Sequence, residues 1–127
     1  MARRGFHADY TVTLYPTHPF RPRTLIDRLT AIGLLEGRNV LTAREIDTAA
    51  TPFCAAVEGR FVPFGDALRG KWYRPYGNYV GEHVLSGARV YLHVLRGALE
   101  LVDIDYLEDL YYAEELLKSG LFSSDGR

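Results

Sequence analysis

The sequence has little cysteine: there is one in 127 residues, with no CxxC pair and no Cys/His spacing suited to a metal. Cys54 therefore cannot form an internal disulfide, and its apolar neighbours predict an inert, buried thiol. The glycines form neither a phosphate-loop nor a dinucleotide-binding pattern, so no motif supports a nucleotide enzyme. We expect no cofactor and no metal.

Long apolar runs are also missing. Arg3 and Arg4 are not followed by the apolar segment of a secretion signal, and no run is long enough to span a membrane. These absences predict a cytoplasmic protein without membrane contact. The length is that of one domain, and we expect a single unit over residues 1–127 with a frayed tail from about 123 to 127.

Lysine is scarce, since thirteen of the fifteen basic residues are arginine, and the charges are unevenly distributed. The formal balance is +2 over residues 1–60, +3 over residues 61–96 and −6 over residues 97–127. No basic residue lies between Glu100 and Glu115, a segment that contains seven carboxylates. Apolar residues alternate with these acids, which indicates an ordered element with a charged surface rather than a disordered acidic tail.

The first half of the chain predicts one strand and one helix. Strict alternation over residues 6–15 is typical of a half-buried strand. Three prolines then interrupt regular structure, and apolar residues at helical spacing predict a helix over residues 23–32 with Gly33 as its left-handed C-terminal residue.

Two hairpins are predicted in the middle of the chain. One joins residues 53–57 to residues 60–64 through Glu58 and Gly59, and the other spans residues 89–104 and turns at Arg96 and Gly97. The second register would place His93 opposite Glu100. It would bury one face made of Val90, Leu92, Val94, Leu99 and Leu101.

A second helix is predicted over about residues 106–118. Asp105 and Glu108 have capping-box spacing, and Gly120 follows the last turn. Glu114 falls on the apolar arc, so we expect an arginine to pair with it. The predicted fold class is therefore α+β: a mainly antiparallel sheet with two amphipathic helices packed on one of its faces.

The other side of this second helix is the leading candidate for a binding site. Its carboxylates surround a tyrosine and fit a basic protein surface, although a merely solvated helix face is the simpler alternative. The predicted contact residues are Asp105, Glu108, Asp109, Tyr112 and Glu115, with Trp72 and Tyr76 as second anchors. We therefore expect a non-enzymatic protein-binding module, for example an immunity-like inhibitor of a toxin or nuclease.

Three alternatives follow from other patterns. His93 and Glu100 could transfer protons in a small-molecule enzyme, and His7 and Asp9 would join them as metal-compatible groups if the first strand lay beside the hairpin. The basic and aromatic stretch from Arg69 to His83 suits nucleic acid, but the acidic last third of the chain and the net charge of −1 disfavour it. A homodimer formed through exposed hairpin or aromatic surface is the third. The strand order between Val40 and Gly87 does not follow from the sequence.

Overall fold

The computed structural model describes residues 7–46, 54–57, 60–63, 72–85 and 87–125. In chain order its elements are β1 (Tyr10–Thr13), α1 (Arg23–Glu36), β2 (Asn39–Ile46), β3 (Cys54–Val57), β4 (Arg60–Pro63), β5 (Trp72–His83), β6 (Val90–Leu95) and α2 (Leu107–Lys118). The predicted α+β class is confirmed. None of the helices in these ranges is long and apolar enough to cross a membrane.

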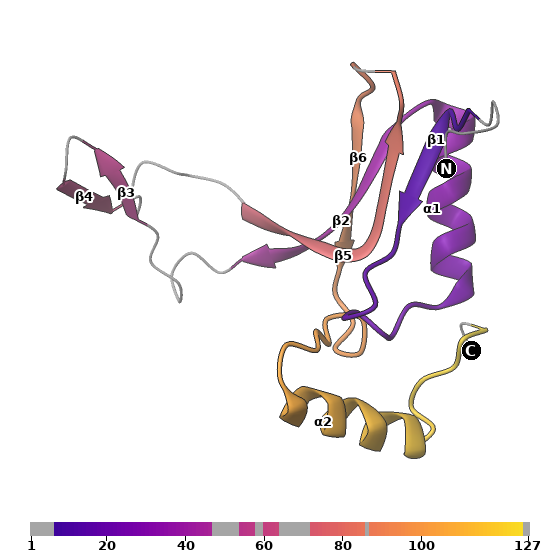
Figure 1. Ribbon diagram of the computed structural model, residues 1–127, viewed down its shortest axis with the longest axis vertical. Coiled ribbons are helices and arrows are strands. Elements are labelled where there is room, and N and C mark those ends of the chain that lie inside the picture. The colour runs from indigo at the N-terminus through magenta and orange to yellow at the C-terminus, as the bar shows by residue number, and fades with distance from the viewer. Residues whose placement is uncertain (1–6, 47–53, 58–59, 64–71, 86, 126–127) are drawn as a thin grey trace.

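The main sheet has the strand order β1-β5-β2-β6, and α1 covers one of its faces (Figure 1). β1 and β2 both run antiparallel to β5, whereas β6 runs parallel to β2. The sheet is therefore mixed rather than purely antiparallel. The reason is topological: β6 follows β5 after a short connection and reverses its direction, so it runs in the same direction as β2.

The predicted hairpin over residues 53–64 is confirmed as β3 and β4, which pair from Cys54 opposite Pro63 to Val57 opposite Arg60. They form a separate two-stranded sheet away from the main one (Figure 1).

The core lies between α1 and the sheet. Leu25 and Leu29 of α1 pack with Val40, Tyr79 and Leu95 from three strands. Because neighbouring side chains on a strand point to opposite faces, Val40 faces α1 and the next residue faces away from it.

α1 continues past the predicted end, so the expectation for Gly33 is wrong. A Cβ atom at Gly33 would overlap the ring of Tyr10, which passes between α1 and β5. The glycine is thus needed for close helix-to-sheet packing, and Gly37, with φ of 62°, is the left-handed residue that ends the helix.

β5 contains a large bulge and bends sharply there (Figure 1). Leu41 pairs with Val80 but the next residue, Thr42, pairs with Tyr76, so residues 77–79 have no paired residue on β2. The buried hydroxyl of Thr42 replaces part of the missing ladder: it accepts the Tyr79 N–H at 3.0 Å, and its one proton is shared between the carbonyls of Tyr76 at 2.6 Å and Tyr79 at 2.9 Å. This bulge brings residues 77 and 78 toward the loops that form the site below.

The predicted hairpin over residues 89–104 is wrong after its first arm. β6 pairs with β2, and residues 98–101 form a turn in which Leu101 N–H donates to Gly97 O at 3.2 Å. Two β5 side chains bind the backbone carbonyls that a second arm would use: Asn78 Nδ2 donates to Glu100 O, and Tyr76 Oη donates to Leu101 O.

The side-chain faces of β6 are also reversed relative to the prediction. Tyr91 and Leu95 pack on the core next to α1, whereas Val90 and Leu92 are exposed on the other face. A shift of one residue is enough for this exchange, since the side-chain period of a strand is two.

Candidate functional site

α2 differs most from the expected packing. Whereas α1 lies on the sheet, α2 lies beyond the end of the strands (Figure 1). Ala113 is its buried residue, and the apolar arc that should cover the sheet faces solvent. On that arc Leu107 is 59%, Tyr111 57% and Leu117 55% exposed.

Both ends of α2 are anchored to the body of the protein. Before the helix, Ile104 N–H donates to Thr17 O at 2.8 Å; after it, Ser124 O accepts the N–H of Arg23 at the start of α1, also at 2.8 Å. The expected loose tail thus begins with an anchored segment. Phe122 adds an edge-on contact with Phe20, with 5.1 Å between ring centroids.

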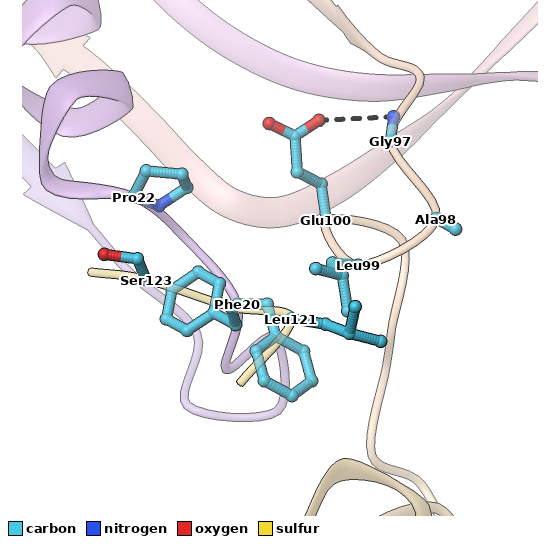
Figure 2. A pocket seen from close by; sticks show the side chains of 9 residues that line it. Phe20, Pro22, Gly97, Ala98, Leu99, Glu100, Leu121 and Ser123 are labelled. Atoms are coloured by element: carbon cyan, nitrogen blue, oxygen red, sulfur yellow. Dashed lines mark hydrogen bonds between the residues drawn. The ribbon is translucent and has the colours of Figure 1, made fainter. Parts of the chain in front are cut away.

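A cavity of about 330 Å³ lies beside this second anchor. Figure 2 shows the side chains that line it. Its walls are largely apolar, and the carboxylate of Glu100 turns back to accept the Gly97 N–H at 3.4 Å. It is lined by Phe20, Pro22, Gly97, Ala98, Leu99, Glu100, Leu121, Phe122 and Ser123. We interpret it as a packing gap between the turn after β6 and the returning C-terminal segment.

The acidic face of α2 points outward. Asp105 and Glu108 are exposed, and Tyr112 is 59% exposed. Asp109 has a structural role as well, because its Oδ2 accepts the N–H groups of Asp105 at 3.0 Å and Tyr106 at 2.9 Å. The helix cap is therefore one residue later than the predicted Asp105 and Glu108 pair.

The arginines in the described ranges do not neutralise this face. Three of them form ion pairs elsewhere, namely Arg23 with Asp27, Arg38 with Glu36 and Arg96 with Glu45. On α2 itself, Glu115 pairs with Lys118 at 2.9 Å on the surface.

The predicted arginine partner of Glu114 is absent among the described residues, where this glutamate is exposed and forms no ion pair. The prediction fails because the arc on which Glu114 lies is not buried. Its carboxylate stays solvated and does not need an arginine.

A second cavity, of about 440 Å³, lies next to the start of α2. It is lined by Tyr15, Thr17, His18, Leu41, Pro75, Tyr76, Gly77, Val80, Asp103 and Asp105. We call it the His18 cavity. Two residues predicted for partner binding, Asp105 and Tyr76, are among its walls, so the acidic face and the cavity are continuous.

Three segments that are distant in the sequence meet at the His18 cavity, and hydrogen bonds hold them together. Tyr15 N–H donates to Gly77 O at 2.9 Å, where the bulge of β5 presents its backbone. Arg21 donates to Tyr15 O at 2.7 Å and to Asn78 O at 3.3 Å. Partial burial lowers the pKa of Arg21, whose guanidinium is held by these carbonyls.

His18 and Asp103 are the chemically distinctive pair in this cavity. The His18 ring is stacked at a tilt on Tyr76, with 4.8 Å between ring centroids. Its side chain is only 9% exposed, and Nδ1 lies 3.6 Å from Asp103 Oδ1, which is too long for a hydrogen bond. Nδ1 has no hydrogen-bond partner, an unusual state for a buried polar atom.

The predicted His93 and Glu100 pair does not form as expected. His93 lies opposite Thr42 across β6 and β2, and its Nδ1 is 3.3 Å from a guanidinium nitrogen of Arg28 on α1. Partial burial and the Arg28 charge lower the pKa of His93, and the Glu100 carboxylate acts in the opposite direction. A histidine next to an arginine is a poor proton acceptor, so this arrangement does not favour proton transfer.

The predicted convergence of His7 and Asp9 with this pair is wrong, because β1 and β6 lie at opposite edges of the sheet. Within the described ranges, no group of three His, Cys, Asp or Glu residues is arranged to hold a metal ion.

The basic and aromatic stretch is largely internal where it is described. Tyr79 and Asn78 are buried, as is Tyr76, whose ring forms a wall of the His18 cavity. Arg69, Lys71 and the side chain of Trp72 lie outside the described residues. The nucleic-acid alternative therefore gains no exposed stacking platform from Tyr76 or Tyr79.

Sequence reasoning missed His18, Asp103 and Arg21. His18 lies between two prolines, and such a constrained loop is a signal for a positioned side chain. Nothing local connects it with Asp103, because the two residues are brought together by the hydrogen bond between their neighbours Thr17 and Ile104, which are far apart in the sequence.

No protein-family model matches this chain, and no curated protein matches it significantly.

Proposed function

We propose that the protein is a non-enzymatic binding module that engages a basic protein partner through α2. The observation that carries this proposal is the position of α2: it is held at both ends and lies off the sheet, with acidic and apolar side chains exposed. Large exposed apolar side chains on an anchored helix are typical of an interaction surface.

The composition of α2 suits a protein interface. Leu107, Tyr111 and Leu117 would form an apolar centre, and Glu108 and Glu115 a charged rim that speeds encounter with a basic surface. An inhibitor of the immunity type, which covers the basic cleft of a toxin or nuclease, is the most specific form of this proposal. It is supported by the charge pattern alone.

The test compares two variants with the same net charge. Glu108→Lys/Glu115→Lys reverses two charges on α2, and Asp27→Lys/Glu36→Lys reverses two exposed acids on α1. Wild type and both variants serve as baits in extracts of the source cells, and captured proteins are quantified by mass spectrometry. We expect a basic protein that is captured by wild type and the α1 variant but lost by the α2 variant.

The captured protein is then purified and titrated directly at several salt concentrations. Equal capture by both variants, or an affinity that does not respond to salt, would remove α2 as the binding surface. Circular dichroism of the α2 variant must first show that its helix content is retained.

A further inference from the structure

We infer that the His18 cavity is a binding site for the cationic end of an arginine or lysine side chain. This inference rests on the proposed function, because the arginine or lysine would belong to the basic protein partner. The evidence for it is the set of polar groups that line the cavity. The cavity lies outside α2, so the acidic face of that helix did not predict it.

The first observation is the unmatched polar atom. His18 Nδ1 is buried without a hydrogen-bond partner, and leaving such an atom unpaired costs about 1 to 3 kcal/mol. A ligand with two N–H groups could donate one to His18 Nδ1 and the other to Asp103 Oδ1, because the two atoms are 3.6 Å apart, once the wall that covers the buried Nδ1 moves aside. The pair therefore favours a donor with at least two N–H groups.

The second observation is the sign of the charge. Asp103, whose side chain is 25% exposed, and Asp105 both line the cavity, and no arginine or lysine is among its lining residues. Neither carboxylate forms an ion pair with a lysine or arginine in the described ranges. A cation is therefore favoured over an anion or a neutral group, and charge-assisted hydrogen bonds would hold it.

The third observation is the shape of the walls. Tyr15, which is half exposed, and Tyr76, whose ring stacks on His18, both line the cavity. Aromatic faces beside carboxylates attract ammonium and guanidinium groups. The volume of about 440 Å³ lies in the range of small-ligand pockets and is far larger than a bare ion needs.

The probe is N-acetyl-arginine amide, with N-acetyl-citrulline amide as its uncharged counterpart of similar shape. Each is titrated into the full chain, and nuclear magnetic resonance follows the His18 ring and the backbone amides of Gly77 and Ile104. We expect saturable shifts with the arginine compound and none with citrulline. Asp103→Asn should weaken binding at least about tenfold, which corresponds to about 1.4 kcal/mol.

Two further variants separate a lost site from a lost fold. Asp105→Asn changes an exposed side chain and should also weaken binding, whereas Asp27→Asn on α1 should bind as wild type does. Absence of saturable shifts in wild type, or equal binding by Asp103→Asn and wild type, would overturn the inference. Magnesium or zinc ions that shift His18 alone and displace the arginine compound would also overturn it, in favour of a metal.

This experiment and the α2 test can fail separately. The Glu108→Lys/Glu115→Lys variant should keep its affinity for N-acetyl-arginine amide within about twofold, because neither side chain lines the cavity. Arginine binding without α2-dependent capture would retain the cavity and reject the proposed function. The reverse result would retain the function and reject the cavity as the site of contact.

Discussion

Replacement of Thr42 by valine tests the origin of the site most sharply, because Thr42 holds the bulge from which the His18 cavity is built. Valine has nearly the same shape, so the change removes hydrogen bonds without opening a hole. The Tyr79 N–H would lose its acceptor, and the carbonyls of Tyr76 and Tyr79 would lose the one hydroxyl proton that they share, all in a fully buried position.

The expected cost follows from these groups. An unpaired buried donor costs about 1 to 3 kcal/mol, and carbonyls with a second lone pair add less, so we expect about 2 to 3 kcal/mol. With a urea m-value of roughly 2 kcal/mol/M, the unfolding midpoint should fall by about 1 M. The amide resonances of residues 77–79 should shift, and so should the ring of His18.

The control is Thr11→Val on β1. Its hydroxyl is exposed and lies 3.4 Å from the Glu82 carbonyl, so the free energy of unfolding should change by no more than about 0.5 kcal/mol. If the two valine variants unfold at the same urea concentration, the Thr42 hydroxyl does not support the bulge and the reasoning is refuted.

Four further outcomes are expected. Gly77→Ala should destabilise by about 1 to 3 kcal/mol in urea, because its Cβ would overlap the ring of Tyr15 and lie 2.7 Å from His18 Cδ2. Gly97→Ala, which faces only the end of the Glu100 side chain, should be nearly neutral. His93→Gln should reduce the loss of stability between about pH 7 and pH 5. The lowered pKa of His93 means that the unfolded chain takes up this proton first, so wild-type stability falls as the pH drops below about 6.5; identical pH profiles would contradict this. Asp109→Ala should increase hydrogen exchange in the first turn of α2 by removing the acceptor of two N–H groups, with Glu114→Ala as the neutral control. Arg21→Gln should weaken binding of N-acetyl-arginine amide, because it releases the Tyr15 and Asn78 carbonyls. Unchanged binding would show that Arg21 does not support the site.

Local signals in the sequence were sufficient for several elements. The helix at residues 107–118 follows from acidic residues in its first turn and Gly120 after its last, and the prediction was off by one residue at the cap. The β3 and β4 hairpin follows from two short apolar runs separated by Glu58 and Gly59. In each case the decisive residues are neighbours in the chain.

Pairings over long distances could not be predicted. β6 pairs with β2 instead of folding back on itself, because side chains of β5 bind the backbone carbonyls of the predicted second arm. The bulge of β5 depends on the Thr42 hydroxyl of β2, which bonds to backbone groups of Tyr76 and Tyr79. The periodicity of the sequence does not reveal such a side-chain contact.

The same distinction applies to the site. The charge pattern alone indicated an acidic face on α2, and among the described residues no arginine forms an ion pair with its carboxylates. The pattern also implied that the opposite arc would be buried, which is wrong, because the anchors at Thr17 and Ser124 hold α2 beyond the end of the sheet. His18 and Asp103 lie near each other beside the anchor in which Ile104 N–H donates to Thr17 O, a contact between distant segments.

The most direct test of the central claim is the ratio of two dissociation constants for the captured basic protein, measured at low salt. Our account predicts that Glu108→Lys/Glu115→Lys raises the constant at least about tenfold above that of Asp27→Lys/Glu36→Lys, although the two variants have the same net charge. A ratio near one would show that overall charge, and not the exposed face of α2, governs binding.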